Sequence, residues 1–204
     1  MPNEAPISRR AGGAIAVAAV LAPTPAWADF ERFAIDPDHF AIGFMTHHLG
    51  YEQVLGMFLE GAGTFEYDAE AQALRNVEIT VQAASVFTNH DARDGHLRSG
   101  DFLDAEANPV IRFVGTSAEA TGASTGIVHG DLTLRGETRP VSFTVTLNKA
   151  ADYPFGAGPP YVLGISARGT VVRSEFGSTY AVGNGWVGDE IALIVELEAI
   201  RQAE

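Results

Sequence analysis

Residues 88 to 104, TNHDARDGHLRSGDFLD, form the most densely charged stretch of the sequence. Acidic, basic and imidazole side chains are gathered there around Leu97. Such a mixture can form a catalytic centre or a metal site, because both need several ionisable groups that converge. It can also form a structural cluster of paired charges. The spacing of the residues separates these three interpretations.

A metal site in this stretch would start from His90 and Asp94, which lie four residues apart and would share one face of a helix. Zinc needs at least one more ligand, and hydrogen-bond partners that orient its ligands, and the spacing of the residues identifies none of these. Elsewhere, His47 and His48 are adjacent on an expected strand and point to opposite faces. The sequence therefore predicts no metal site.

A catalytic centre is not predicted either. Ser99 lies near His96 but lacks the G-x-S-x-G surroundings of a hydrolase nucleophile. The chain has no cysteine, so catalysis by a thiol is excluded. We expect a protein that is not an enzyme and that uses no cofactor.

Local signals predict a short helix in this stretch. Thr88 and Asp91 have the spacing of a capping box. Asp94 and Arg98 lie four apart in the favourable acidic-first order. Gly100 is well placed to end the helix.

We interpret this helix as a structural element that closes one end of a barrel. Four of its charged side chains would form pairs that tie it to the neighbouring strands, because unpaired buried charge is costly: Arg93, Asp94, His96 and Arg98. The alternative is that Arg93 or Arg98 meets the polar head of a ligand, since a guanidinium group fits a phosphate.

The chain around this helix alternates apolar and polar residues with a period of two. The clearest segments are VEITVQAAS (77–85), VSFTVTLN (141–148) and IALIVELEA (191–199). This alternation is typical of half-buried antiparallel strands. Similar runs lie near 35–48, 54–67, 109–120, 126–136 and 161–174. About eight strands with short links, and no alternating helices, predict an all-β fold that is either a closed up-and-down barrel or a sandwich.

Residues 1–28 have the pattern of a cleaved secretory signal. Arg9 and Arg10 precede an apolar segment, residues 11–21, and Ala26-Trp27-Ala28 fits the small-x-small cleavage rule. The apolar segment is too short to cross a bilayer, so we expect no stable membrane insertion. The sequence predicts a periplasmic protein, with export by the Sec or the twin-arginine route left open.

Residues 29–204 then form one domain of a size that can bury a substantial core. Removal of the signal leaves 11 basic and 25 acidic residues from the 13 and 26 of the whole chain, which is a net charge of −14. Nucleic acids and anionic lipid surfaces are themselves polyanions, so such a chain is not expected to bind them.

Eight blocks of sequence, in the same order along the chain, resemble the YceI family of lipocalin-like proteins, whose members bind polyisoprenoids and related lipids. The first is IDPDHFAIGF (35–44), with Phe40 where a serine is usual, followed by HLG (48–50) and GMF (56–58). The others are RDGHLRSGDFLDA (93–105), NPVIRF (108–113), GDLTLRGETRPV (130–141), RSEFG (173–177) and VGDEIALIVELEA (187–199). The resemblance implies an eight-stranded antiparallel up-and-down barrel, with the short helix between its third and fourth strands. It also implies a long apolar ligand in the lumen and no catalytic residues.

Strand parity predicts which side chains face that lumen and bind the ligand. They are Phe40, Ile42, Phe44, His48, Phe58, Ile79, Phe113, Leu132, Phe143, Val145, Ile165, Val171 and Leu193. Four small residues on the same faces are expected to leave space for a lipid tail: Gly56, Gly130, Ala167 and Gly169. An eight-stranded barrel can also fill its lumen with its own side chains, so a filled core is the alternative.

The sequence as a whole predicts an exported protein that sequesters or carries a long-chain isoprenoid, such as a polyprenyl phosphate or a ubiquinone. A long isoprenoid would need a cavity in the upper part of the usual range of about 300–1,000 Å³. One alternative is a stress-linked scavenger of apolar small molecules, and another is a soluble partner of a membrane cytochrome. An enzyme on lipid substrates is a third.

Overall fold

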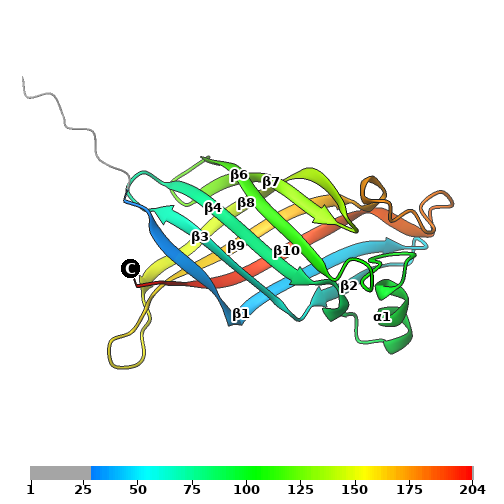
Figure 1. The fold of residues 1–204 in the computed structure, drawn as a ribbon, viewed down its shortest axis with the longest axis horizontal. Helices are drawn as coiled ribbons and strands as arrows, with labels where there is room; N and C mark the ends of the chain where they lie inside the picture. The colour runs from blue at the N-terminus through cyan, green and yellow to red at the C-terminus, as the bar shows by residue number, and fades with distance from the viewer. Residues whose placement is uncertain (1–28, 204) are drawn as a thin grey trace, which may run out of the picture.

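The structure is a computed structural model that describes residues 29–203. Its strands form a closed antiparallel barrel, in which each strand pairs with the next and the last pairs with the first (Figure 1). The strands of the closed ring are β1 (Glu31–His48), β3 (Gly61–Asp68), β4 (Ala73–Gln82), β6 (Val110–Ala120), β7 (Thr125–Leu134), β8 (Glu137–Asp152), β9 (Tyr161–Val172) and β10 (Val187–Arg201). The barrel is closed by 11 residue pairs between β1 and β10, from Phe33–Arg201 to His48–Val187. The predicted fold class is confirmed.

Two shorter strands complete two of these eight positions. The long strand β1 pairs with β3 along its first half and with β2 (Glu52–Phe58) along its second half. β2 and β3 therefore occupy one strand position, which is interrupted at residues 59–60. The Ser85 hydroxyl accepts hydrogen bonds from the amides of Leu59 (3.2 Å) and Glu60 (3.1 Å) at this interruption.

The third position is divided in the same way. β4 is followed by a 3₁₀ turn, η1 (Ala83–Ser85), and by β5 (Val86–Phe87), which pairs with β2. The helix α1 (Asp91–Arg98) comes next, before β6. It therefore lies between the third and fourth strand positions, as predicted. No helix among the described residues is long and apolar enough to cross a membrane.

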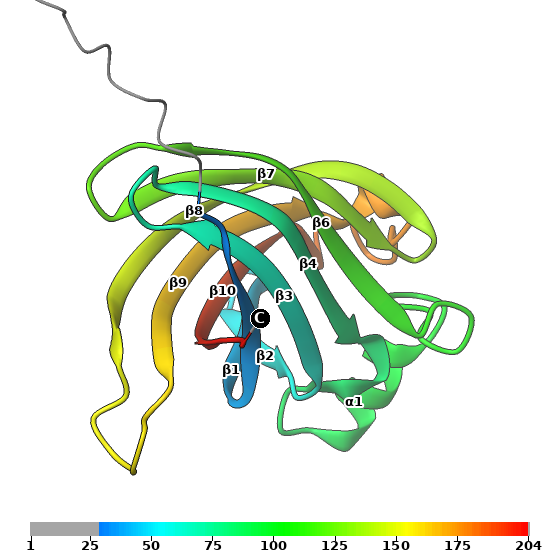
Figure 2. The same ribbon diagram turned by 60° about the vertical axis from the view of Figure 1, so that its left-hand side comes forward.

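The two ends of the barrel carry different parts of the chain. α1, the turn between β1 and β2, and the segment from η2 (Arg173–Phe176) to β10 lie together at one end (Figures 1 and 2). Residue 29, the C-terminal end of β10 and the long turn between β8 and β9 lie at the other end. The first group of segments is called the α1 end below, and the second the terminal end.

The terminal end is filled by buried side chains. Phe33 of β1 is 1% exposed and stacks on its cross-strand partner Phe65, with ring centroids 5.5 Å apart and an interplanar angle of 14°. Leu163 and Ala199 pair across β9 and β10 at the same level and are also buried. These residues belong to the main apolar core, so the barrel is closed there by packing.

Candidate ligand-binding cavity

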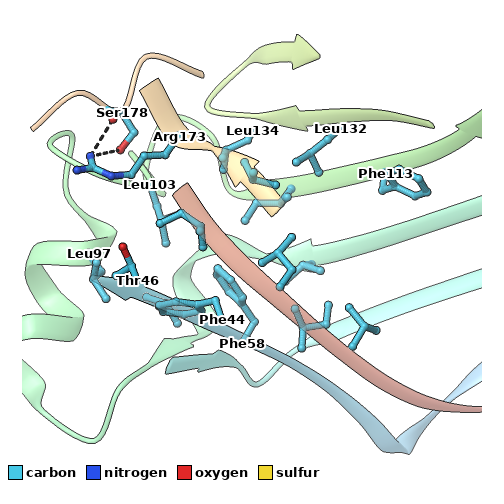
Figure 3. Close-up of a pocket in the computed structure, with 18 of the residues that line it drawn as sticks. Phe44, Thr46, Phe58, Leu97, Leu103, Phe113, Leu132, Leu134, Arg173 and Ser178 are labelled. Atoms are coloured by element: carbon cyan, nitrogen blue, oxygen red, sulfur yellow. Dashed lines mark hydrogen bonds between the residues drawn. The ribbon is translucent and has the colours of Figure 1, made fainter. Parts of the chain in front are cut away.

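The rest of the lumen holds a cavity of about 480 Å³ (Figure 3). Its wall is almost entirely apolar and comes from strands all round the barrel. The volume lies in the lower half of the usual range for ligand sites. The prediction of a cavity in the upper part of that range is therefore wrong, because packed side chains occupy the terminal end of the barrel.

The structure places all but one of the predicted ligand-binding residues on the cavity wall. Those that line it are Ile42, Phe44, His48, Phe58, Ile79, Phe113, Leu132, Phe143, Val145, Ile165, Val171 and Leu193. Strand parity found them because the barrel preserves the alternation of faces along each strand. That they bind a ligand stays a prediction.

Phe40 is the exception and does not line the cavity. It packs against the main core, and its ring lies over Gly61, where an added Cβ would come within 2.6 Å of it. The pairing of β1 with β10 shifts register between Ile35 and Phe40. From Phe40 to Thr46 the pairing is regular, so Phe40 shares the face of Ile42 and Phe44 but lies nearer the terminal end, where the packed core occupies the lumen.

The inward glycines do not leave empty space, which corrects a second prediction. Phe44 is the cross-strand partner of Gly56, and a Cβ on Gly56 would lie 2.2 Å from the Phe44 ring. Phe143 and Gly169 are partners in the same way, with a clash at 2.7 Å. Each ring lies over the backbone of its neighbouring glycine. The aromatic ring is thereby held against the barrel wall, and this leaves the centre of the lumen open.

Polar groups are gathered at the α1 end, where ion pairs were expected to tie α1 to the neighbouring strands. The predicted capping box is wrong: the N-cap is His90, whose Nδ1 accepts the amide of Arg93 (3.2 Å). Thr88 instead donates to Asp94 Oδ1, through its amide at 2.8 Å and also through its hydroxyl. His90 and Asp94, the two candidate metal ligands, are thus both engaged in forming the helix.

Asp94 is the buried centre of this arrangement, at 3% exposure. Burial raises the pKa of its carboxyl group. The two hydrogen bonds from Thr88 and the positive charges of Arg98 and Arg93 outweigh this effect, so the pKa of Asp94 is below its usual value. Asp94 is therefore a carboxylate that organises the start of the helix.

The arginines of α1 bind backbone carbonyls in place of the predicted ion pairs. Arg98 donates to the carbonyls of Ala84 (2.8 Å) and Val86 (2.9 Å). Arg93 donates from Nε to the Thr88 hydroxyl and from Nη2 to the Thr88 carbonyl, both at 2.7 Å. These bonds fasten the helix to β5 and the turn before it. His96 Nε2 lies 2.9 Å from Asp101 Oδ2, within hydrogen-bonding distance.

Arg173 is a residue of the site that the sequence reasoning missed. It lines the cavity at the α1 end, is 4% exposed, and lies over the Phe102 ring at 5.4 Å (Figure 3). Burial lowers the pKa of its guanidinium group, while the nearby Asp189 acts in the opposite direction. It donates to four backbone carbonyls, those of Gly188 (2.8 Å), Ser178 (2.8 Å), Tyr180 (2.8 Å) and Val187 (3.1 Å). Arg173 therefore holds together the segment that borders the cavity opening. Only its place in the RSEFG block could have drawn attention to it.

One group of potential metal ligands occurs within residues 29–203. Asp36, His39 and Glu198 bring their ligand atoms within 4.8 Å of one another on the outside of the β1–β10 pair. His39 Nδ1 lies 2.8 Å from Asp36 and 3.7 Å from Glu198. The hydrogen bond with Asp36 raises the pKa of His39 and lowers that of Asp36. This contact accounts for the cluster, which lies away from the cavity.

The profile of the YceI-like domain matches residues 33–199. The chain belongs to the YceI family. It is 37% identical over 164 residues to a UPF0312 protein of Pseudomonas aeruginosa, a match that covers 80% of this chain and 83% of that protein. It is 34% identical over 172 residues to a UPF0312 protein of Pseudomonas savastanoi pv. phaseolicola, covering 83% and 86% of the two chains.

Solved structures with the same fold extend this result. A YceI protein of Campylobacter jejuni matches with a TM-score of 0.66 and 27% identity, over 78% of this chain and 90% of that one. BcnA of Burkholderia cenocepacia matches with a TM-score of 0.69 and 19% identity, over 80% and 98%. A polyisoprenoid-binding domain from Saccharophagus degradans, implicated in plant cell wall breakdown, matches with a TM-score of 0.57 and 11% identity, over 85% and 100%. The YceI barrel is thus the common scaffold, and the apolar cavity within it is the candidate site.

Proposed function

We propose that this YceI protein binds the apolar tail of an isoprenoid lipid in its lumen, and that it sequesters or carries this lipid in the periplasm. The observation that carries the proposal is the cavity of about 480 Å³ with an almost wholly apolar wall. The polyisoprenoid-binding domain from Saccharophagus degradans, which has the same fold, supports it.

The physical basis of binding is removal of the tail from water. Each buried methylene contributes about 0.8 kcal/mol before ordering costs are subtracted. The cavity-lining residues that are exposed are Leu49, His96, Tyr180 and Trp186. All four lie at the α1 end, so a tail would enter there and stop at the Phe33–Phe65 stack. No covalent step is needed, and we propose a binding protein with no catalytic role.

Purification without detergent, followed by native mass spectrometry and organic extraction, tests the proposal. We expect an isoprenoid lipid at near one-to-one stoichiometry. A narrow preference for one isoprenoid would favour a carrier, whereas a mixture of unrelated apolar compounds would favour a scavenger. Turnover of a lipid ester would instead indicate an enzyme.

The variant Gly56→Ala tests whether the ligand binds in the lumen, and it does so without adding a charge there. The three atoms nearest to the new methyl group belong to the Phe44 ring, at 2.2–2.8 Å, so the ring must move into the cavity. We expect the lipid content to fall, and Phe44→Ala in the same chain to restore it. Gly43→Ala on β1 is the matched control, because its nearest neighbours lie 3.7–3.8 Å away. Equal lipid content in all three variants would show that the lumen is not the binding site.

Export is proposed from the pattern in residues 1–28, which lie outside the described residues. We expect the periplasmic fraction to contain protein that begins at Asp29, as shown by N-terminal sequencing. Intact Met1 on the exported protein, or protein retained in the inner membrane, would contradict this.

A further inference from the structure

The opening of the cavity is surrounded by exposed apolar side chains from two separate turns. Leu49 and Tyr51 belong to the turn between β1 and β2 and are 45% and 89% exposed. Tyr180 and Trp186 belong to the segment before β10 and are 44% and 55% exposed. These four residues are called the mouth rim. Leu49, Tyr180 and Trp186 also line the cavity, so the rim is continuous with the lumen.

The two halves of the rim are joined by the backbone. The Leu49 amide donates to the Trp186 carbonyl at 2.8 Å, which places the two turns side by side. Tyr180 packs edge-on against His96, with ring centroids 5.0 Å apart, and lies 5.3 Å from Phe102. The rim is therefore a single supported surface at the α1 end.

Leu49 shows that the rim is not an incidental feature of the fold. Its φ angle is +51°, a left-handed conformation that residues other than glycine, asparagine and aspartate seldom adopt. A turn at the surface favours a polar residue at such a position. Leucine is unfavourable there both for the backbone and for contact with water. Its presence is explained if the side chain leaves water when the protein meets its partner.

We propose that the mouth rim docks the protein reversibly on a zwitterionic lipid bilayer, with the cavity opening against the membrane. Tryptophan and tyrosine suit the boundary between headgroups and hydrocarbon, because each joins an apolar ring to a polar group. Glu52 and Asp101 are exposed at the same end, and residues 29–204 carry a net charge of −14. An anionic surface would repel this end, so the bilayer is zwitterionic.

The function of this docking rests on the proposed binding of a lipid in the lumen. A lipid tail with low solubility in water can then pass between bilayer and lumen without crossing the solvent. The surface contact itself is separate from the lumen. It can therefore be measured independently of any bound ligand.

Vesicles of phosphatidylcholine provide the test, with a protein of residues 29–204, which contains every strand of the closed barrel. Trp186 is its only tryptophan, because the other of the two lies at position 27. We expect its emission to shift to shorter wavelength when vesicles are added, and the protein to float with them. Unchanged emission and no flotation would overturn the proposal, as would binding that requires anionic lipid.

Leu49→Asn is the decisive variant because asparagine tolerates the left-handed conformation. We expect vesicle partitioning to fall roughly tenfold through loss of the buried leucine side chain, while the thermal midpoint stays equal or rises. Phe155→Ser is the matched control, since Phe155 is 74% exposed in the turn between β8 and β9, at the terminal end. It should leave partitioning unchanged.

Two further outcomes separate the possibilities. The first is a dimer, detected by sedimentation equilibrium, that is lost in Leu49→Asn while no vesicle binding occurs. This result would make the rim a contact between two copies of the protein and would overturn the proposal. Lipid content measured on the same proteins distinguishes rim from lumen. Loss of vesicle binding in Leu49→Asn, together with unchanged lipid content in Gly56→Ala, would support the rim while refuting luminal binding.

Discussion

Phenylalanines occupy both the filled terminal end and the hollow remainder of this barrel, but their cross-strand partners differ. At the terminal end Phe33 pairs with Phe65 on the neighbouring strand, and the two rings stack on each other. Towards the α1 end Phe44 faces Gly56 and Phe143 faces Gly169. A ring beside a glycine can lie on the wall, whereas two facing rings must fill the space between them. In these three pairs, the cross-strand partner of the phenylalanine thus distinguishes the packed end from the open lumen.

The ends also differ in how they treat polar groups. The terminal end is filled by apolar side chains, and its one buried carboxylate in the described chain, Asp68, accepts hydrogen bonds from backbone amides. The α1 end buries two charged side chains, Asp94 and Arg173, and satisfies them through hydrogen bonds. Apolar packing contributes stability in proportion to the buried area. Buried charge has a strong effect mainly when a partner is removed. We therefore expect substitutions of buried apolar side chains and of buried charged side chains to differ in size and in dependence on pH.

The largest effect is expected from Phe33→Ala at the terminal end. The ring is almost fully buried against Phe65, so the free energy of unfolding should fall by about 3–5 kcal/mol. Denaturant titration measures it, and Phe155→Ala, at an exposed site, serves as control. A loss below about 1 kcal/mol would mean that this end is not tightly packed.

Asp94→Ala should have the next largest effect, about 1–3 kcal/mol, through the loss of a buried acceptor for the Thr88 amide and hydroxyl. Asp91→Ala, at an exposed position in the same helix, should cost less than about 1 kcal/mol through its weaker effect on the helix dipole. Equal costs for the two variants would show that α1 depends on its dipole and not on the Asp94 hydrogen bonds.

Phe58→Ala, on the cavity wall, should cost only about 1–2 kcal/mol in lipid-free protein. Part of its ring borders empty space and loses few contacts there. Calorimetry of lipid-free and lipid-loaded protein checks this, and the loaded form should show the larger loss. A cost equal to that of Phe33→Ala in lipid-free protein would remove the distinction between the filled and hollow regions.

The smallest effect is the pH dependence of the stability that Asp94 contributes at the α1 end. Because the folded pKa of Asp94 is lowered, the unfolded chain takes up the proton first as the pH falls. The stability due to this carboxylate should be complete above the unfolded pKa of about 3.9 and lost as the pH falls through the folded pKa. The difference in unfolding free energy between wild type and Asp94→Asn should therefore be constant from about pH 7 to 5 and narrow below about pH 4. A difference that persists at low pH would point to packing instead.

Much of the fold followed from the sequence by itself. Alternation along segments such as 141–148 and 191–199 identified the strands and their inward faces, because a strand turns successive side chains to opposite sides whatever it pairs with. The same reasoning put Phe44, Phe113 and Phe143 on the lumen wall. The charged stretch after residue 88 was correctly assigned a helix between the third and fourth strand positions.

The tertiary structure alone decided how the space and the buried charges are used. Alternation assigns a side chain to a face, but the volume left on that face depends on its neighbours across strands. The roles of Gly56 and Gly169 were therefore reversed, and Phe40 proved to pack against the core and not to line the cavity. Helical spacing paired Asp94 with Arg98, yet a buried polar group takes whichever partner the fold brings within hydrogen-bonding distance. For the same reason Arg173, whose partners are carbonyls 5 to 15 residues away in the chain, could not be recognised before the barrel was closed.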